Sequence, residues 1–131
     1  MISSLKNSQI PAKKFPTTGQ DATLQGLQNI LSDYQCMTVY KPIYVEAQAA
    51  VATAMYLRAG QKPPKSLVNG STNNKVTKVP SVLLTPQAAN KDNIKTVTYG
   101  GQPLIGADGY WTPQQVCTSQ FQSACQAAGI S

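Results

Sequence analysis

Few side chains in this chain of 131 residues could do chemistry. The absence of histidine excludes a Ser-His-Asp triad, a Cys-His pair and a zinc site built on histidine. A glycosidase would need two paired carboxylates, but the acidic residues are scattered singly along the sequence. They are Asp21, Asp33, Glu46, Asp92 and Asp108. The inventory therefore argues against an enzyme, and it predicts no catalytic residue, no cofactor and no metal site.

The net charge of +6 raises the question of a nucleic-acid partner. Lysines on one face would neutralise phosphates, yet Lys13 and Lys14 are the only adjacent pair and the others are spread from Lys6 to Lys95. No aromatic residues interleave with them at a spacing suited to base stacking. We therefore expect solvated surface lysines and no nucleic-acid partner.

No segment of the sequence is typical of a membrane anchor. The first residues, MISSLKNSQIP, lack the apolar core of a secretory signal. The longest apolar stretch, residues 43–59, is interrupted by polar residues and is too short to cross a bilayer. We expect no membrane insertion, but a fragment of a larger precursor would also lack a signal, so the compartment stays open.

The three cysteines differ in what their surroundings predict. Cys36 falls in a predicted buried strand, where we expect an inert, small apolar side chain. Cys117 and Cys125 would be about 12 Å apart on one unbroken helix, beyond the reach of a disulfide. Either both are unpaired, or the helix breaks after Cys117 and restarts at Thr118 or Ser119, both good helix caps.

Helices and strands alternate in the first part of the chain. Asp21 is suited to cap a helix whose Leu24, Leu27 and Leu31 share one face, and this helix should end near Asp33. A short β-type run at residues 14–19 precedes it, and a buried strand at residues 36–40 follows it. This order indicates a parallel β-α-β unit.

A second helix is predicted from Pro42 or Ile43 to Ala59, because Pro42, Glu46, Arg58 and Gly60 are all favourable end signals. Its small apolar face is typical of packing on a sheet. Residues 61–78 read as an exposed loop, with its tight turn at Asn69-Gly70.

The rest of the chain is expected to contain short strands and a helical tail. Residues 79–84 and 94–99 have β character, and residues 90–93 and 100–109 read as turns. Thr112, Pro113 and Gln115 fit a capping box that opens the tail, and Gly129 fits its end. Trp111, beside this cap, is expected to be a packing residue.

Three segments in fixed order resemble the C-terminal part of the sugar-binding proteins of bacterial ABC importers: GQDATLQGLQNI at 19–30, MTVYKP at 37–42 and VPSVLLTPQAANKDNIK at 79–95. Within these periplasmic binding proteins of type I, the likeness is closest to the xylose-binding branch. It covers about residues 1–97, and the tail from Thr98 departs from it. The resemblance implies an α/β fold, here a partial one with a short, mainly parallel sheet flanked by helices.

The resemblance also implies two ligand-binding residues. Asp21, in GQD, matches the family's sugar-binding aspartate, and Lys41, in VYKP, matches a lysine that contacts the sugar. A carboxylate accepts hydrogen bonds from hydroxyls, and an ammonium donates to hydroxyl or ring oxygens. The alternatives are a plain helix cap for Asp21 and a solvated surface lysine for Lys41.

The domain organisation and partners follow from the same resemblance. Residues 1–42 and 79–131 would belong to the C-terminal lobe, and residues 43–78 would be a crossover helix and loop of the N-terminal lobe. The implied partners are a pentose-like monosaccharide, an ABC permease and the missing N-terminal lobe. The implied location is extracytoplasmic, periplasmic or at the cell surface, where oxidising conditions favour a disulfide between Cys117 and Cys125.

The sequence thus predicts a non-catalytic protein that binds a sugar by cleft closure in its intact form. The alternative is a stand-alone assembly module that retains part of this fold. Such a module would dimerise through the helix at residues 43–59, or exchange that element with a second copy of the chain, to cover its apolar face.

Overall fold

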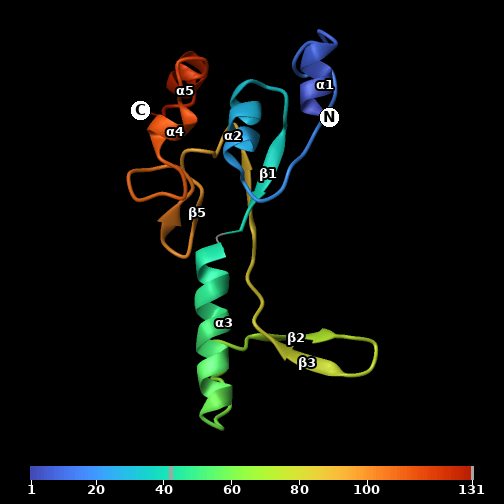
Figure 1. Ribbon diagram of the computed structural model, residues 1–131, viewed down its shortest axis with the longest axis vertical. Helices are drawn as coiled ribbons and strands as arrows, with labels where there is room; N and C mark the ends of the chain where they lie inside the picture. Colours follow the sequence, from blue (N-terminus) through green and yellow to red (C-terminus); the bar gives the residue numbers. More distant parts are fainter. Residues whose placement is uncertain (42, 131) are drawn as a thin grey trace. The chain divides into compact units, whose positions relative to one another are not determined.

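The computed structural model describes residues 1–41 and 43–130 (Figure 1). These residues form two compact units: unit 1 contains residues 1–41 and 86–130, and unit 2 contains residues 43–85. Residues 79–85 group with unit 2, because the strand at 78–81 pairs within that unit. The assignment of residues 1–42 and 79–131 to one lobe of the intact protein stays a prediction.

Unit 1 contains short helices and strands from both ends of the chain. In chain order they are α1 (Ile2–Asn7), α2 (Leu24–Leu31), β1 (Met37–Tyr40), β4 (Gln87–Asn90), β5 (Thr98–Tyr99), β6 (Gln102–Pro103), α4 (Pro113–Val116) and α5 (Gln122–Ala127). The mixture of helices and small sheets confirms the expected α/β class.

The expected mainly parallel sheet is wrong for these strands. β1 pairs with β4, and β5 with β6, and both pairs are antiparallel. Parallel pairing in the described residues is limited to single bridges, of which Thr18 to Met37 spans α2. The β-α-β unit therefore exists only in reduced form, since Pro16 cannot donate to a ladder and the segment before α2 is too short to extend the pairing.

The N-cap of α2 is Thr23, not Asp21 as the sequence suggested. The Thr23 hydroxyl accepts a hydrogen bond of 3.1 Å from the backbone N–H of Gly26. A cap needs extended backbone, which Thr23 has, whereas Asp21 has a φ of 69°. The side chain of Asp21 is therefore available for another partner.

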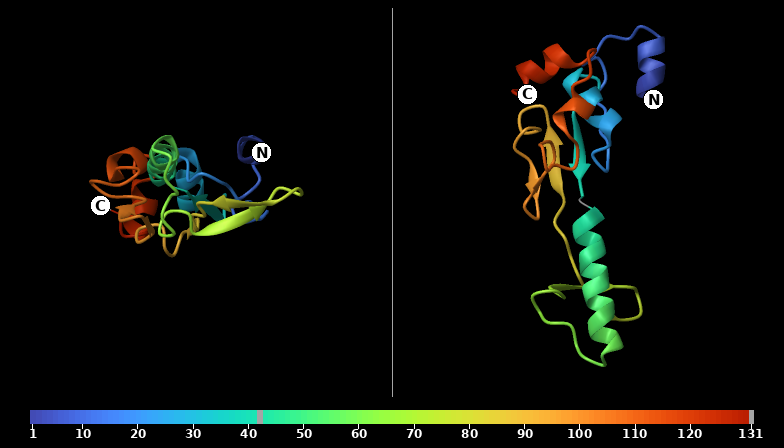
Figure 2. Two further views of the ribbon diagram at one scale, coloured as in Figure 1. Left: turned by 90° about the horizontal axis from the view of Figure 1, so that it is seen from below. Right: turned by 60° about the vertical axis from the view of Figure 1, so that its left-hand side comes forward.

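The core of unit 1 is completed by the tail. α2 and β1 contribute Leu27, Ile30 and Tyr40, each at most 1% exposed. The tail contributes five buried side chains: Leu104, Ile105, Val116, Cys125 and Ile130. Figure 2 shows the orange and red tail segments folded back beside α2 and β1. The segment beyond residue 97 is thus an integral part of unit 1.

The tail is interrupted between its two helices. The capping box of Thr112 and Gln115 is present as predicted, but α4 ends after four residues. The break brings the Cα atoms of Cys117 and Cys125 to 5.8 Å, and their sulfurs form a disulfide. Cys36, expected in a buried strand, is instead exposed because it precedes the first residue of β1.

Unit 2 consists of a long helix and a hairpin. The helix is α3 (Ile43–Arg58), and the hairpin pairs β2 (Gly70–Asn73) with β3 (Lys78–Ser81). The predicted tight turn at Asn69-Gly70 is wrong. The chain turns at residues 74–77, where Oδ1 of Asn74 accepts hydrogen bonds from the backbone N–H groups of Val76 and Thr77.

The helix α3 presents large apolar side chains to solvent within the described structure. Five of them are at least 60% exposed: Ile43, Tyr44, Val51, Met55 and Leu57. No helix among the described residues combines the length and apolarity required to span a membrane.

Candidate functional site

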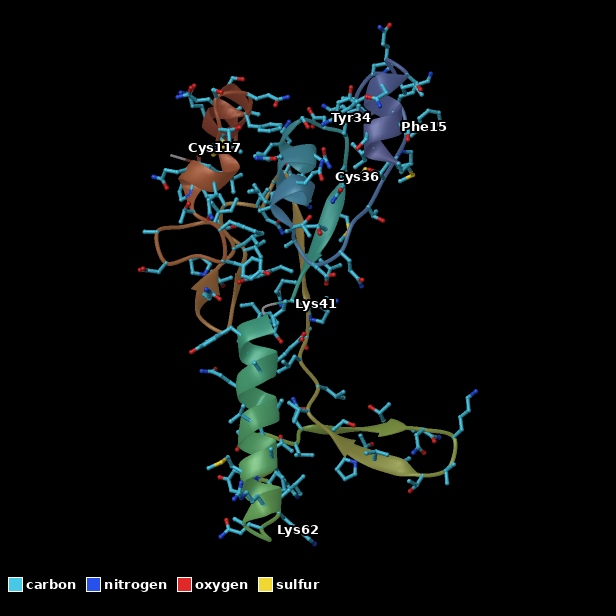
Figure 3. All side chains as sticks on the ribbon, viewed as in Figure 1. Phe15, Tyr34, Cys36, Lys41, Lys62 and Cys117 are labelled. Atoms are coloured by element: carbon cyan, nitrogen blue, oxygen red, sulfur yellow. A yellow bond between two sulfur atoms is a disulfide. The ribbon has the colours of Figure 1, made fainter. Side chains whose placement is uncertain are left out.

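The structure brings Asp21 and Lys41 together. The Nζ atom of Lys41 lies 2.8 Å from Oδ1 of Asp21, which is ion-pair distance. Lys41 follows β1 directly, and Figure 3 shows Cys36 and Lys41 at the opposite ends of this strand. Both residues belong to unit 1, so their proximity is a property of that unit alone.

The ion pair is accessible to solvent. The Asp21 side chain is 58% exposed and that of Lys41 is 34% exposed. In solvent such a pair contributes little to stability, about 0 to 1 kcal/mol. Stability alone therefore gives little reason for these two groups to meet.

The backbone that carries Asp21 is unusual. Asp21 and Ala22 have φ angles of 69° and 45°, so two successive residues other than glycine are left-handed. This conformation costs about 1–2 kcal/mol per residue, and strained backbone of this kind occurs often at functional sites. Surrounding contacts must therefore hold the turn.

Two hydrogen bonds hold Ala22, which is fully buried. Its backbone N–H donates to Oγ1 of Thr38 at 3.2 Å, and its carbonyl accepts from Nε1 of Trp111 at 2.8 Å. Thr38 lies on β1 and Trp111 immediately precedes the cap of α4. The expected packing role of Trp111 is confirmed, since its ring lies against the core. The hydrogen bond to Ala22 was not predicted.

The pair combines two complementary hydrogen-bonding groups. An ionised carboxylate only accepts hydrogen bonds, and an ammonium only donates them. A ligand with adjacent hydroxyl groups can donate a hydrogen bond to the Asp21 carboxylate and accept one from the Lys41 ammonium. An apolar ligand can do neither. The arrangement therefore suits a polyhydroxylated ligand.

Tyr40, which precedes Lys41, belongs to the core. Tyr40 is fully buried, with its ring centroid 6.5 Å from that of Tyr99 and 5.7 Å from that of Tyr110. Burial raises the pKa of the Tyr40 hydroxyl, and Tyr110 adds to this effect. Tyr40 cannot present a ring face to a ligand, and its role is in the core.

A second ion-pair cluster surrounds Asp33. Lys91 lies 2.9 Å and Lys13 3.5 Å from Oδ2 of this residue. Burial opposes ionisation, but the hydrogen bond and charge of Lys91, and then Lys13, lower the pKa of Asp33 below 3.8.

The described residues contain no group of three or more histidine, cysteine or acidic residues able to hold a metal ion.

The chain is similar to known sugar-binding proteins over part of their length. It is 45% identical over 82 residues to the D-xylose-binding periplasmic protein of Escherichia coli. The matched segment covers 63% of this chain and 24% of that protein. It is 34% identical over 103 residues to the protein of the same name in Haemophilus influenzae. This matched segment covers 79% of this chain and 28% of that protein. No family model matches the chain.

A solved structure shows the same relationship. It is a carbohydrate transporter solute-binding protein from Chloroflexus aurantiacus in complex with D-glucose, with a TM-score of 0.54 and 32% identity. The match covers 60% of this chain and 22% of that one. The chain thus spans about a quarter of the length of the curated relatives it matches. In sequence and in structure, the chain is similar to part of the sugar-binding proteins of bacterial transporters, as its three sequence segments indicated.

Proposed function

We propose that this chain supplies one wall of a sugar-binding cleft in an extracytoplasmic solute-binding protein. The ion pair of Asp21 and Lys41, at 2.8 Å, is the observation that carries the proposal. The two residues expected to contact the sugar, 20 positions apart in sequence, meet at one accessible point. The names of the relatives support a monosaccharide as the ligand, with D-xylose as the first candidate.

In this proposal the sugar binds without chemical change. One sugar hydroxyl donates to the Asp21 carboxylate, and a neighbouring oxygen accepts from the Lys41 ammonium. Each group then keeps a charge-assisted hydrogen bond when water leaves the cleft. Delivery of the sugar to a membrane permease completes the function.

The opposite wall of the cleft comes from a second lobe. In the relatives, about three quarters of the chain lies outside the matched segment, and that length accommodates a second lobe. The exposed apolar side chains of α3 favour assignment of this helix to the second lobe, against which they would be buried. The comparisons do not support the alternative of a stand-alone module that dimerises through this helix.

A hybrid protein tests the proposed site. In it, this chain replaces the matching segment of the Escherichia coli relative, and D-xylose binding is measured by titration calorimetry. We expect Asp21→Asn and Lys41→Met each to weaken binding about 10- to 100-fold, because each removes a hydrogen bond to a charged group. D-glucose, titrated in parallel, tests whether the site selects between the two sugars.

Asp33→Asn and Lys91→Met are matched controls, since they remove another ion pair of unit 1 with a distance of 2.9 Å. They should leave the affinity within about twofold of the unmodified hybrid. Equal losses in both sets of variants would contradict the proposed site. The 131-residue chain alone should bind D-xylose weakly or not at all, because affinity requires enclosure of the ligand. Micromolar binding by this chain would contradict that expectation.

A further inference from the structure

Two consecutive residues of the tail, Tyr110 and Trp111, contact the neighbours of both candidate ligand-binding residues. Trp111 donates its indole N–H to the carbonyl of Ala22, which follows Asp21. The ring of Tyr110 lies 5.7 Å from that of Tyr40, which precedes Lys41. The Tyr110–Trp111 pair therefore connects the two segments whose side chains form the ion pair.

The Tyr110–Trp111 pair is held in place by contacts of its rings and of its backbone. The two rings lie 5.3 Å apart in an edge-to-face arrangement. The backbone N–H groups of Tyr110 and Trp111 donate to Pro103 and Leu104, and the Trp111 carbonyl accepts from Gly106. Leu104 is fully buried in the core of unit 1. Both rings are thus supported by regular backbone hydrogen bonds and a packed core.

The contact with Ala22 acts at the strained point of the site. The left-handed angles of Asp21 and Ala22 are unfavourable without external contacts. The hydrogen bonds from Ala22 to Thr38 and from Trp111 to Ala22 fix this turn from β1 and from the tail. A change of these backbone angles would swing the Asp21 carboxylate away from Lys41.

We propose that Trp111 is a positioning residue that holds the Asp21–Lys41 pair ready for the sugar. This inference rests on the proposed function, since it assigns Trp111 a role in the same site. Trp111 does not contact the ligand in this account. It acts through the Ala22 carbonyl, while Tyr110 acts through the ring of Tyr40.

The first test does not depend on sugar binding. In the 131-residue chain, Trp111→Phe retains a ring and removes the indole donor. We expect hydrogen exchange of the Ala22 amide to accelerate roughly tenfold or more, and the nuclear Overhauser contact between Asp21 and Lys41 to weaken. Exchange at Leu27 and Ile30, in the core of α2, should change less than twofold.

Tyr34→Phe is the matched control, because the Tyr34 hydroxyl also donates to a backbone carbonyl, that of Ile10, at 3.2 Å. It should leave exchange at Ala22 unchanged. If Trp111→Phe fails to fold, Trp111→Tyr retains a ring without the indole N–H and should accelerate exchange at Ala22 in the same way. Unchanged exchange at Ala22 in the folded variants would overturn the inference.

The second test measures D-xylose affinity in the hybrid protein. Trp111→Phe should weaken binding about tenfold, and Tyr34→Phe should not, at similar melting temperatures. If Asp21→Asn leaves the affinity unchanged, the proposed function fails, whereas the exchange result at Ala22 stands. If Asp21→Asn weakens binding and Trp111→Phe does not, the function stands and the positioning role fails.

Discussion

Lys91 donates from Nζ to both carboxylate oxygens of Asp33, each at 2.9 Å, across 58 residues of sequence. Asp33 follows the C-cap of α2, and Lys91 follows the last residue of β4. The ion pair therefore joins the end of a helix from the first part of the chain to a turn from the second part. It fixes two segments on which the core of unit 1 depends.

Asp33→Asn should remove the acid sensitivity that this ion pair produces. Because the pKa of Asp33 is lowered in the folded state, its contribution is present above about pH 4 and is lost as pH falls through the folded pKa. We expect a loss of about 1 kcal/mol at pH 7. Asparagine tolerates the left-handed φ of 62° at this position, so backbone strain does not confound the result.

Urea unfolding at pH 7 and at successively lower pH values measures this difference. The curves of the unmodified protein and the variant should converge as Asp33 becomes protonated. A difference in unfolding free energy that stays constant down to pH 2 would contradict the assignment.

Tyr40→Phe should protect the protein at alkaline pH. Burial raises the pKa of the Tyr40 hydroxyl above 10.0, so its contribution to stability is present below pH 10 and is lost as pH rises through the folded pKa. Since the hydroxyl has no hydrogen-bond partner among the described residues, the variant should lie within about 1 kcal/mol of the unmodified protein at pH 7. Above pH 10 the variant should become the more stable of the two, as measured by thermal unfolding. Parallel stability curves from pH 8 to 12 would refute this.

Thr23→Ala should destabilise α2, because it removes the side chain that accepts from the Gly26 N–H. The expected loss is about 1 kcal/mol. Asp21→Asn, two positions earlier, is the natural comparison, since Asp21 does not cap this helix. Chemical unfolding of both variants separates the two positions. A larger loss for Asp21→Asn would show that the cap has been assigned to the wrong residue.

The disulfide of Cys117 and Cys125 predicts a thiol count of one in the unfolded, unreduced protein, from Cys36 alone. Replacement of both bonded cysteines by serine should cost about 2–3 kcal/mol for a loop of this length. Ellman's reagent and thermal unfolding measure the two effects. A count of three thiols would exclude the bond.

Elements with strong local end signals could be predicted from the sequence. The expected helix from residue 42 or 43 to 59 agrees closely with α3 from Ile43 onward, while residue 42 lies outside the described residues. The capping box of Thr112 and Gln115 is present. These features depend on residues a few positions apart, whose propensities act within one helical turn.

Elements that depend on distant partners could not be predicted in this way. β4, of sequence QAAN, has little β propensity and forms because β1 offers it a ladder. Aspartate is favoured at helix N-caps, but the left-handed backbone of Asp21 excludes it from capping α2. A contact with a distant residue, Trp111, helps to hold this turn through the carbonyl of Ala22. The proximity of Asp21 and Lys41 was expected only through the family resemblance, since no local spacing brings a helix start and a strand end together.

The core of unit 1 combines side chains that are synthesised far apart in time. Leu27 and Ile30 leave the ribosome well before Leu104, Val116 and Ile130, which share one buried cluster with them. At a synthesis rate of about 5–20 residues per second, the nascent chain therefore carries an incomplete apolar surface for several seconds. During translation, unit 1 is accessible to chaperones until the residues up to Ile130 have been made.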